Sequence, residues 1–79
     1  MKIHLRLFAH FRSHLSDEQG GRESLITMAN GQTIAHLIEQ LGIPLDLPKV
    51  ILLNGMQKGL EDELHDGDTV SIFPPVAGG

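Results

Sequence analysis

The sequence predicts a small α+β domain in which one mixed β-sheet packs against a single main helix. Two segments near the ends of the chain alternate in polarity, which indicates strands because successive side chains of a strand point to opposite faces. Apolar residues at clear helical spacing occur between them, over residues 34–41. Pairs of turn-forming residues separate the remaining segments. The resulting order, strands first, then a helix, then further strands, is typical of one sheet on one helix.

The first strand is expected over Lys2–Phe8, where polarity alternates along the whole segment. One face of this strand carries Ile3, Leu5 and Leu7, and the other carries His4, Arg6 and Phe8. Phe11 and Leu15 are four residues apart, so we expect a short helix over Ala9–Leu15. The glycine-containing segment Ser16–Arg22 is expected to be a loop, and Glu23–Met28 a second strand that Asn30-Gly31 ends.

The main helix is expected to begin after Thr33, which is a favourable N-cap residue. Its apolar stripe consists of Ile34, Leu37, Ile38 and Leu41. Gly42 follows this stripe and is the residue type that commonly ends a helix. Pro44 and Pro48 then bracket a connection.

The second half of the chain is predicted to be three strands. Lys49–Leu53 is apolar on both faces, as expected of a buried strand. Asn54-Gly55 favours a tight hairpin turn with a short return strand at Met56–Lys58. An acidic, turn-rich segment, Glu61–Asp68, precedes the last strand, Thr69–Phe73. This order is the β-grasp arrangement, with a domain over residues 1–73 and an extended tail over residues 74–79.

Composition narrows the range of functions. Seventy-nine residues with 41% apolar content make one small domain with one core. The absence of cysteine excludes disulfides, thiolate metal sites and a cysteine nucleophile. A net charge of −4 argues against nucleic-acid binding and is compatible with a positively charged protein partner. Without a long apolar run or a signal-peptide pattern, we expect a cytoplasmic protein that does not bind membranes.

The chain ends on Gly78-Gly79, which leaves an α-carboxylate on a carbon without a side chain. Two glycines form a thin tip that passes through a channel too narrow for a Cβ atom. Pro74 and Pro75 hold the base of the tail extended, since proline fixes φ. Val76 and Ala77 lie between the prolines and the tip. The tail is therefore suited to offering its carboxylate to another enzyme, although a terminal diglycine also occurs by chance or as an inert end.

Phe8 and Phe73 lie on the strand faces opposite to the predicted core residues. If the first and last strands are neighbours, the two rings form an exposed apolar patch at the root of the tail, which is typical of a partner interface. The alternative is that one or both rings fold beneath a loop.

Other polar groups carry weaker indications. His10 and His14 have a helical metal-ligand spacing, but no further ligands are in register, so we expect no metal site. The sequence also lacks a glycine-rich phosphate loop followed by Lys-Ser or Lys-Thr, so we expect no bound cofactor. Glu61-Asp62-Glu63 is expected to be a solvated turn or a docking patch for a basic partner.

The end of the chain, Phe73-Pro74-Pro75-Val76-Ala77-Gly78-Gly79, resembles the C-terminal signature of the MoaD/ThiS sulfur-carrier family of ubiquitin-like β-grasp proteins. The preceding Asp66-Gly67-Asp68-Thr69-Val70 is similar to the MoaD branch, and so is Phe8-Ala9-His10-Phe11-Arg12 after the first strand. The paired prolines favour this branch over the thiazole-forming relatives. The resemblance covers essentially the whole chain.

The resemblance implies that Gly79 is adenylated by a MoeB-like partner that uses ATP, and that a persulfide donor then converts it to a thiocarboxylate. The sulfur would pass to molybdopterin in a heterotetramer with a MoaE-like large subunit. Tail residues Pro74–Gly78 would enter the partner's channel, and the chain itself would be a co-substrate rather than an enzyme. Three alternatives stay open: sulfur delivery to thiamine, cysteine or tRNA, a ubiquitin-like modifier joined to lysine, and a plain interaction module.

Overall fold

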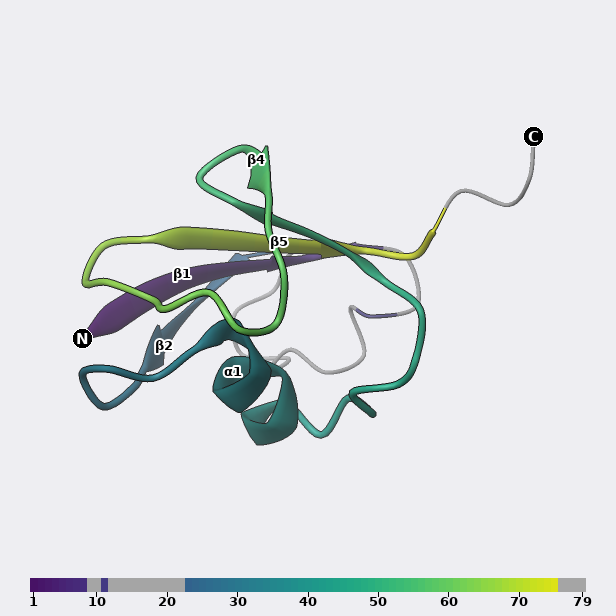
Figure 1. Cartoon of the computed structure of the whole chain (residues 1–79). Helices are drawn as coiled ribbons and strands as arrows, with labels where there is room; N and C mark the ends of the chain where they lie inside the picture. Colours follow the sequence, from purple (N-terminus) through teal and green to yellow (C-terminus); the bar gives the residue numbers. More distant parts are fainter. Residues whose placement is uncertain (9–10, 12–22, 76–79) are drawn as a thin grey trace.

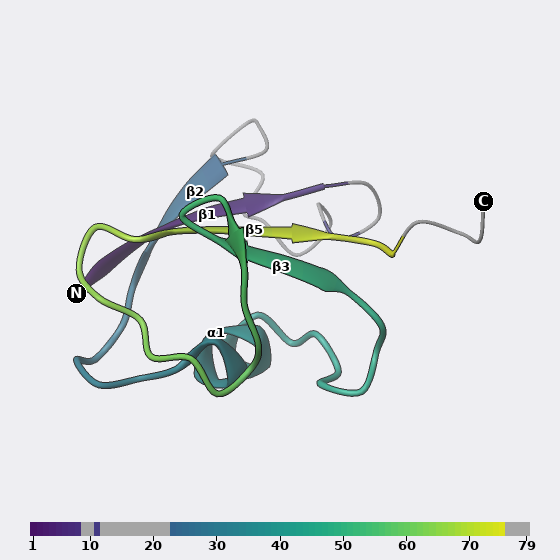
Figure 2. The same cartoon turned by 45° about the horizontal axis from the view of Figure 1, so that its top comes forward.

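The computed structural model describes residues 1–8, 11 and 23–75 of the 79-residue chain. Its elements are β1 (Lys2–Leu7), β2 (Glu23–Thr27), α1 (Ile34–Gln40), β3 (Val50–Leu53), β4 (Met56–Gln57) and β5 (Thr69–Phe73). The strands form one sheet in the order β2-β1-β5-β3-β4, and α1 lies beneath one face of it in both views (Figures 1 and 2). β1 and β5 are parallel, and the other neighbouring pairs are antiparallel. The predicted mixed sheet on one helix is confirmed.

Element boundaries differ from the predictions by about one residue. β1 ends at Leu7 rather than Phe8, and α1 ends at Gln40, with Leu41 as its C-cap. Terminal residues of an element commonly fall outside its regular hydrogen bonding, which accounts for these shifts. The predicted helix at Ala9–Leu15 and loop at Ser16–Arg22 lie outside the described residues apart from Phe11, which is fully buried.

The core lies between α1 and the face of the sheet that α1 covers. All the core side chains predicted on the two alternating strands are buried, and so are three of the four in the helix stripe. These residues are Ile3, Leu5, Leu7, Val70, Ile72, Ile34, Leu37 and Ile38. Leu41 differs, because it is half-buried at the helix end and packs against the margin of the core. Burial of these apolar groups is the main favourable term that holds the helix on the sheet.

The prediction that β3 is buried on both faces is wrong. Ile51 is buried, whereas Val50, Leu52 and Leu53 are half-buried. Among the described residues, α1 covers one face of the sheet and no helix covers the other, and β3 has the two-residue strand β4 as its outer neighbour. The apolar side chains at Val50 and Leu52 therefore belong to the uncovered face, which we call the outer face.

Both ends of α1 have the caps that its flanking residues predict. Thr33 is the N-cap. Its hydroxyl oxygen accepts a hydrogen bond from the backbone N–H of His36, and the Nδ1 of His36 accepts one from the backbone N–H of Thr33. At the other end, Gly42 adopts φ +79° and donates to the Glu39 carbonyl. The next N–H, from Ile43, reaches the Ile38 carbonyl, which completes a Schellman motif.

The connection from α1 to β3 is fastened by one lysine. The Lys49 ammonium donates to the backbone carbonyls of Pro44, Leu45 and Leu47, which gathers the loop around it. Partial burial lowers the pKa of Lys49 from 10.5, and the nearby Asp46 carboxylate opposes this shift. The two prolines therefore bracket a loop closed by its own lysine.

Within the described part of the chain, no helix is long and apolar enough to span a membrane.

Candidate functional site

The root of the tail lies at the end of the central strand of the sheet. β5 has β1 on one side and β3 on the other, and its last residue, Phe73, is followed by Pro74 and Pro75. Pro74 is half-buried, and Pro75 is exposed. The chain therefore leaves the middle of the sheet rather than one of its edges (Figure 1).

Phe8 and Phe73 meet at this point. Because β1 and β5 run parallel with Leu7 opposite Ile72, the residues that follow each of these are neighbours. The Phe8 N–H donates to the Ile72 carbonyl at 3.1 Å. The two rings stack with centroids 4.2 Å apart and planes 10° from parallel, and both side chains are half-buried. The predicted contact between the two phenylalanines at the root of the tail is confirmed.

Three further residues, Arg6, Val50 and Leu52, lie on the same face of the sheet as this pair. The sequence analysis did not single them out as site residues. The Arg6 guanidinium carbon lies 5.6 Å from the centre of the Phe8 ring, within the range of a cation–π contact. Val50 pairs with Phe73 across β3 and β5, and Leu52 pairs with Ser71. Arg6 is two residues before Phe8, so the alternation along the first strand already predicted that both side chains point to the same face. Val50 and Leu52 could be placed only once the pairing of β3 with β5 was known.

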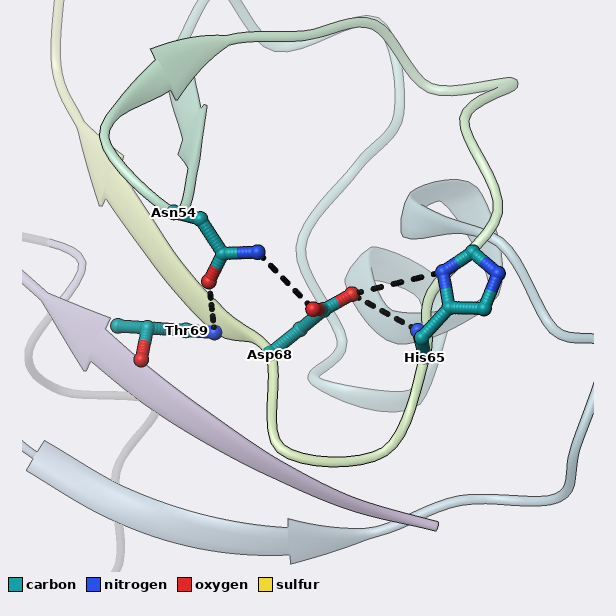
Figure 3. Close-up of polar contacts among 4 residues, drawn as sticks. All are labelled: Asn54, His65, Asp68 and Thr69. Atoms are coloured by element: carbon teal, nitrogen blue, oxygen red, sulfur yellow. Dashed lines mark hydrogen bonds and ion pairs between the residues drawn. The ribbon is translucent and has the colours of Figure 1, made fainter.

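The opposite end of β5 is fixed by a polar network (Figure 3). The Asp68 carboxylate accepts hydrogen bonds from the side-chain amide of Asn54 at 2.9 Å and from the backbone N–H of His65 at 2.8 Å. The side-chain oxygen of Asn54 accepts a hydrogen bond from the backbone N–H of Thr69. Asn54 and Gly55 have φ of +52° and +86°, as predicted for the hairpin turn. The network therefore joins the β3–β4 turn to the start of β5.

The turn before β5 also fixes the start of β1. The Asp66 carboxylate accepts the Lys2 N–H, and the Gly67 N–H donates to the Lys2 carbonyl, each at 2.7–2.8 Å. The Asp68 carbonyl accepts the His4 N–H at 2.8 Å. The Asp-Gly-Asp sequence thus sets the register of the two parallel strands, which in turn places Phe8 beside Phe73.

Within the described residues, no group of three or more His, Cys, Asp or Glu side chains could hold a metal ion. His10 and His14 lie outside these residues, as do Val76, Ala77, Gly78 and Gly79. A hollow of about 290 Å³ is lined by residues 45–49, 51 and 58–60, and neither Phe8 nor Phe73 is among its lining residues. The described side chains at the tail root are the half-buried Phe8 and Phe73 and the exposed Arg6, so this surface is apolar and cationic.

A family model described as Mut7-C ubiquitin matches residues 1–78. The chain belongs to this family of MoaD/ThiS-like sulfur carriers. Its mixed five-stranded sheet on one helix is the ubiquitin-like β-grasp fold.

Three relatives illustrate the range of this carrier family. The chain is 33% identical to Small archaeal modifier protein 3 of Haloferax volcanii over all of both proteins. It superposes with a TM-score of 0.75 on a putative molybdopterin converting factor subunit 1 from Pyrococcus furiosus, at 29% identity over 96% of this chain and 99% of that one. It also superposes on a chain of the complex of molybdopterin-converting factor subunits 1 and 2 from Helicobacter pylori, with a TM-score of 0.64 and 25% identity over all of both chains.

The names of these relatives describe small modifiers or subunits of a larger factor. The Helicobacter pylori structure holds its relative in a complex with subunit 2 of the molybdopterin-converting factor. The interface role of Phe8 and Phe73, the channel role of Pro74–Gly78 and the division of the chain at residue 73 stay predictions.

Proposed function

We propose that this protein is a sulfur carrier for molybdopterin synthesis, with the Gly79 carboxylate as its reacting group. The observation that carries the proposal is the stacked Phe8–Phe73 pair at the base of a Pro-Pro tail that ends in diglycine. An apolar patch beside the exit of the tail provides a docking surface, and the tail then reaches the partner's active site. The converting-factor relatives support molybdopterin as the acceptor.

The chemistry begins with activation, because a carboxylate is a poor acyl donor. A Gly79 carboxylate oxygen attacks the α-phosphorus of ATP on a MoeB-like enzyme, and pyrophosphate leaves. The outer sulfur of a persulfide donor then displaces AMP and forms an acyl disulfide. A second thiol cleaves its S–S bond and releases the thiocarboxylate.

The thiocarboxylate sulfur is transferred to the precursor of the molybdopterin dithiolene in a MoaE-like large subunit, with which the carrier forms a heterotetramer. Hydrolysis returns the Gly79 carboxylate for another cycle. Gly78 and the residues before it occupy the enzyme channel at each stage. The catalytic groups belong to the partners, so the chain is a co-substrate that binds no cofactor itself and acts in the cytoplasm.

A second candidate is a ubiquitin-like modifier, which the 33% identity to a protein named as a modifier favours. Its activated glycine would form an amide with a lysine instead of a thiocarboxylate. Both functions begin with the same acyl-adenylate. Sulfur delivery to thiamine, cysteine or tRNA uses the same thiocarboxylate and differs only in the acceptor.

Intact mass spectrometry tests the proposal. The protein is purified from its own cells and measured again after incubation with the adenylating enzyme, ATP and a sulfur donor. We expect a species heavier by one oxygen-to-sulfur exchange at Gly79. Conjugate ladders on a denaturing gel with no such species would establish the modifier instead. An unchanged mass with no conjugates would reject both functions.

A further inference from the structure

The side chain of Arg6 lies on the outer face of the sheet, on β1, between the tail root and the rest of that strand. Its β1 neighbours on this face are Lys2, His4 and Phe8, because every second residue points the same way. On the adjacent strands it is in register with Glu23 of β2 and Ser71 of β5. Arg6 is thus the cation nearest to the aromatic pair along β1.

The guanidinium of Arg6 is positioned by an aromatic contact rather than by an ion pair with a described residue. It lies 5.6 Å from the centre of the Phe8 ring, and Phe8 is itself stacked on Phe73. Within residues 1–8, 11 and 23–75, its N–H groups make no hydrogen bond or ion pair. The nearest carboxylate in register, Glu23, lies 4.0 Å from the imidazole of His4. Contact with an aromatic face leaves the edge of the guanidinium free to bind a carboxylate through two parallel hydrogen bonds.

The charge on this face differs from that of the rest of the molecule. The chain has a net charge of −4. Several of its acidic groups lie on α1 or on loops outside the sheet, at Glu39, Asp46, Glu61, Asp62, Glu63 and Asp66. Among the described strand residues, the outer face instead carries Lys2 and Arg6 against one carboxylate, that of Glu23. Charge complementarity therefore favours an acidic partner at this face, although the net charge is compatible with a basic one.

We propose that Arg6 is a specificity-determining anchor that binds a carboxylate of the enzyme which adenylates the tail. The enzyme would present an Asp or Glu side chain beside an apolar pocket for the stacked Phe8 and Phe73. Arginine next to aromatic residues at the centre of a patch is the composition typical of interface hot spots. The inference rests on the proposed function, since it names the chemistry by which the activating partner recognises this face.

The test measures the dissociation constant for the adenylating enzyme without ATP, by isothermal titration calorimetry, together with kcat for adenylation at saturation. Arg6→Glu is expected to raise Kd by roughly 30-fold or more, because it removes the anchor and places like charges together. Arg6→Gln should raise Kd about tenfold, and Arg6→Lys less than Arg6→Gln, since lysine keeps the charge but not the planar fork. The value of kcat should stay the same, because the tail is intact.

Lys58→Glu is the matched control, because it makes the same charge change at an exposed residue just after β4. It is expected to change Kd by less than about twofold. Equal effects of Arg6→Glu and Lys58→Glu, or an Arg6→Gln variant that binds as the wild type does, would overturn the anchor. If Arg6→Glu does not fold, Arg6→Gln decides the matter, since it adds no charge.

Salt dependence gives a second readout. Raising the ionic strength should weaken wild-type binding more than Arg6→Gln binding, since the variant has lost the ion pair. Identical salt slopes would contradict the proposal. A wild-type protein that is adenylated while its Arg6 variants bind normally would leave the proposed function standing and remove this inference. A wild-type protein that no adenylating enzyme accepts would reject both.

Discussion

At the scale of the single residue, Phe73 both ends the central strand and forms part of the aromatic pair. It closes the central strand and carries the first residue of the tail, and its ring stacks on Phe8 at 4.2 Å. Its backbone pairs with Val50 on the other side. A half-buried aromatic ring at such a junction stabilises the local fold a little, by about 0.5–1.5 kcal/mol for the ring pair. The larger contribution is expected in the complex.

Phe73→Asp is therefore expected to weaken binding of the adenylating enzyme by about 2 kcal/mol or more, because it removes an aromatic anchor and buries a carboxylate. The binding constant is measured by calorimetry, with circular dichroism to verify the fold. Met56→Asp is the control, since Met56 is 63% exposed on β4, away from the tail root. If both variants bind as tightly as the wild type, Phe73 is not an interface residue.

At the scale of the element, α1 is short and depends on its caps. It spans Ile34–Gln40 and has no acidic residue in its first turn. His36 stands at the N3 position, where its Nδ1 accepts a hydrogen bond from the Thr33 N–H at 2.9 Å. Glutamate is a more usual residue at this position of a capping box, and its charge also interacts favourably with the N-terminal end of the helix dipole.

His36→Glu should raise the free energy of unfolding by about 0.5–1 kcal/mol, as measured by urea denaturation at neutral pH. Gln40→Glu is the matched control, because it places a new carboxylate in the last turn, where the dipole disfavours it. We expect that variant to be neutral or slightly destabilising. A gain of the same size in both variants would contradict the capping argument.

The Asp68 network is the corresponding element at the start of β5. The Asp68 side chain is only 14% exposed and accepts two hydrogen bonds, from Asn54 and from His65. Hydrogen bonds to a charged acceptor contribute more to stability than neutral ones do. Their loss should loosen the turn that holds β1 and β5 in register.

Asp68→Ala is expected to lower the free energy of unfolding by about 2–3 kcal/mol, because it leaves the Asn54 amide and the His65 N–H without their partner. Glu63→Ala, at an exposed acidic residue of the same loop, should have an effect within about 0.5 kcal/mol. Chemical denaturation of both variants provides the comparison. Equal stabilities would mean that the network does not hold the turn.

At the scale of the whole molecule, the core and the tail have separate tasks. Thirteen of the described apolar residues are buried in the core between α1 and the sheet, and they include Phe11 from the segment between β1 and β2. The tail root lies at one end of β5, and the network that sets the strand register lies at the other. The fold therefore places the tail root beside the outer face, as the proposed function requires.

Deletion of Gly79 is expected to leave the melting temperature unchanged and to abolish thiocarboxylate formation, because the carboxylate is then displaced from the adenylating site. Gly78→Val should also keep the fold but block entry into the channel, since a branched side chain is too wide. Melting curves and intact mass after incubation with the enzyme are the readouts. A deletion variant that is still activated would contradict the proposed mechanism.

Leu37→Ala is expected to have the opposite effect to the tail variants, lowering stability without affecting activation of the tail. Leu37 is fully buried in the middle of the core, so its truncation should cost about 3 kcal/mol of unfolding free energy. This is a large fraction of the 5–15 kcal/mol typical of whole domains. Where the variant still folds, its tail should be adenylated at the normal rate. Loss of adenylation in a folded variant would mean that core and tail are coupled.

The sequence by itself determined the elements, because their signals are local. Alternation predicted β1 and β5, helical spacing and Thr33 predicted α1, and the Asn54-Gly55 pair predicted the hairpin turn. The resemblance of the tail to the sulfur carriers predicted the family. Polarity alone could not distinguish a strand buried on both faces from one that adds an apolar patch to the outer face, so the prediction for β3 was wrong.

Tertiary structure alone decided which strands are neighbours. The parallel pairing of β1 with β5 brings Phe8 onto Phe73 from positions 65 residues apart, and the pairing of β3 with β5 adds Val50. A net charge of −4 is compatible with a basic partner, yet Arg6 and Lys2 share the sheet face opposite α1. The physical reason is that a partner contacts a surface, and a surface is assembled from residues distant in sequence by the packing of the sheet.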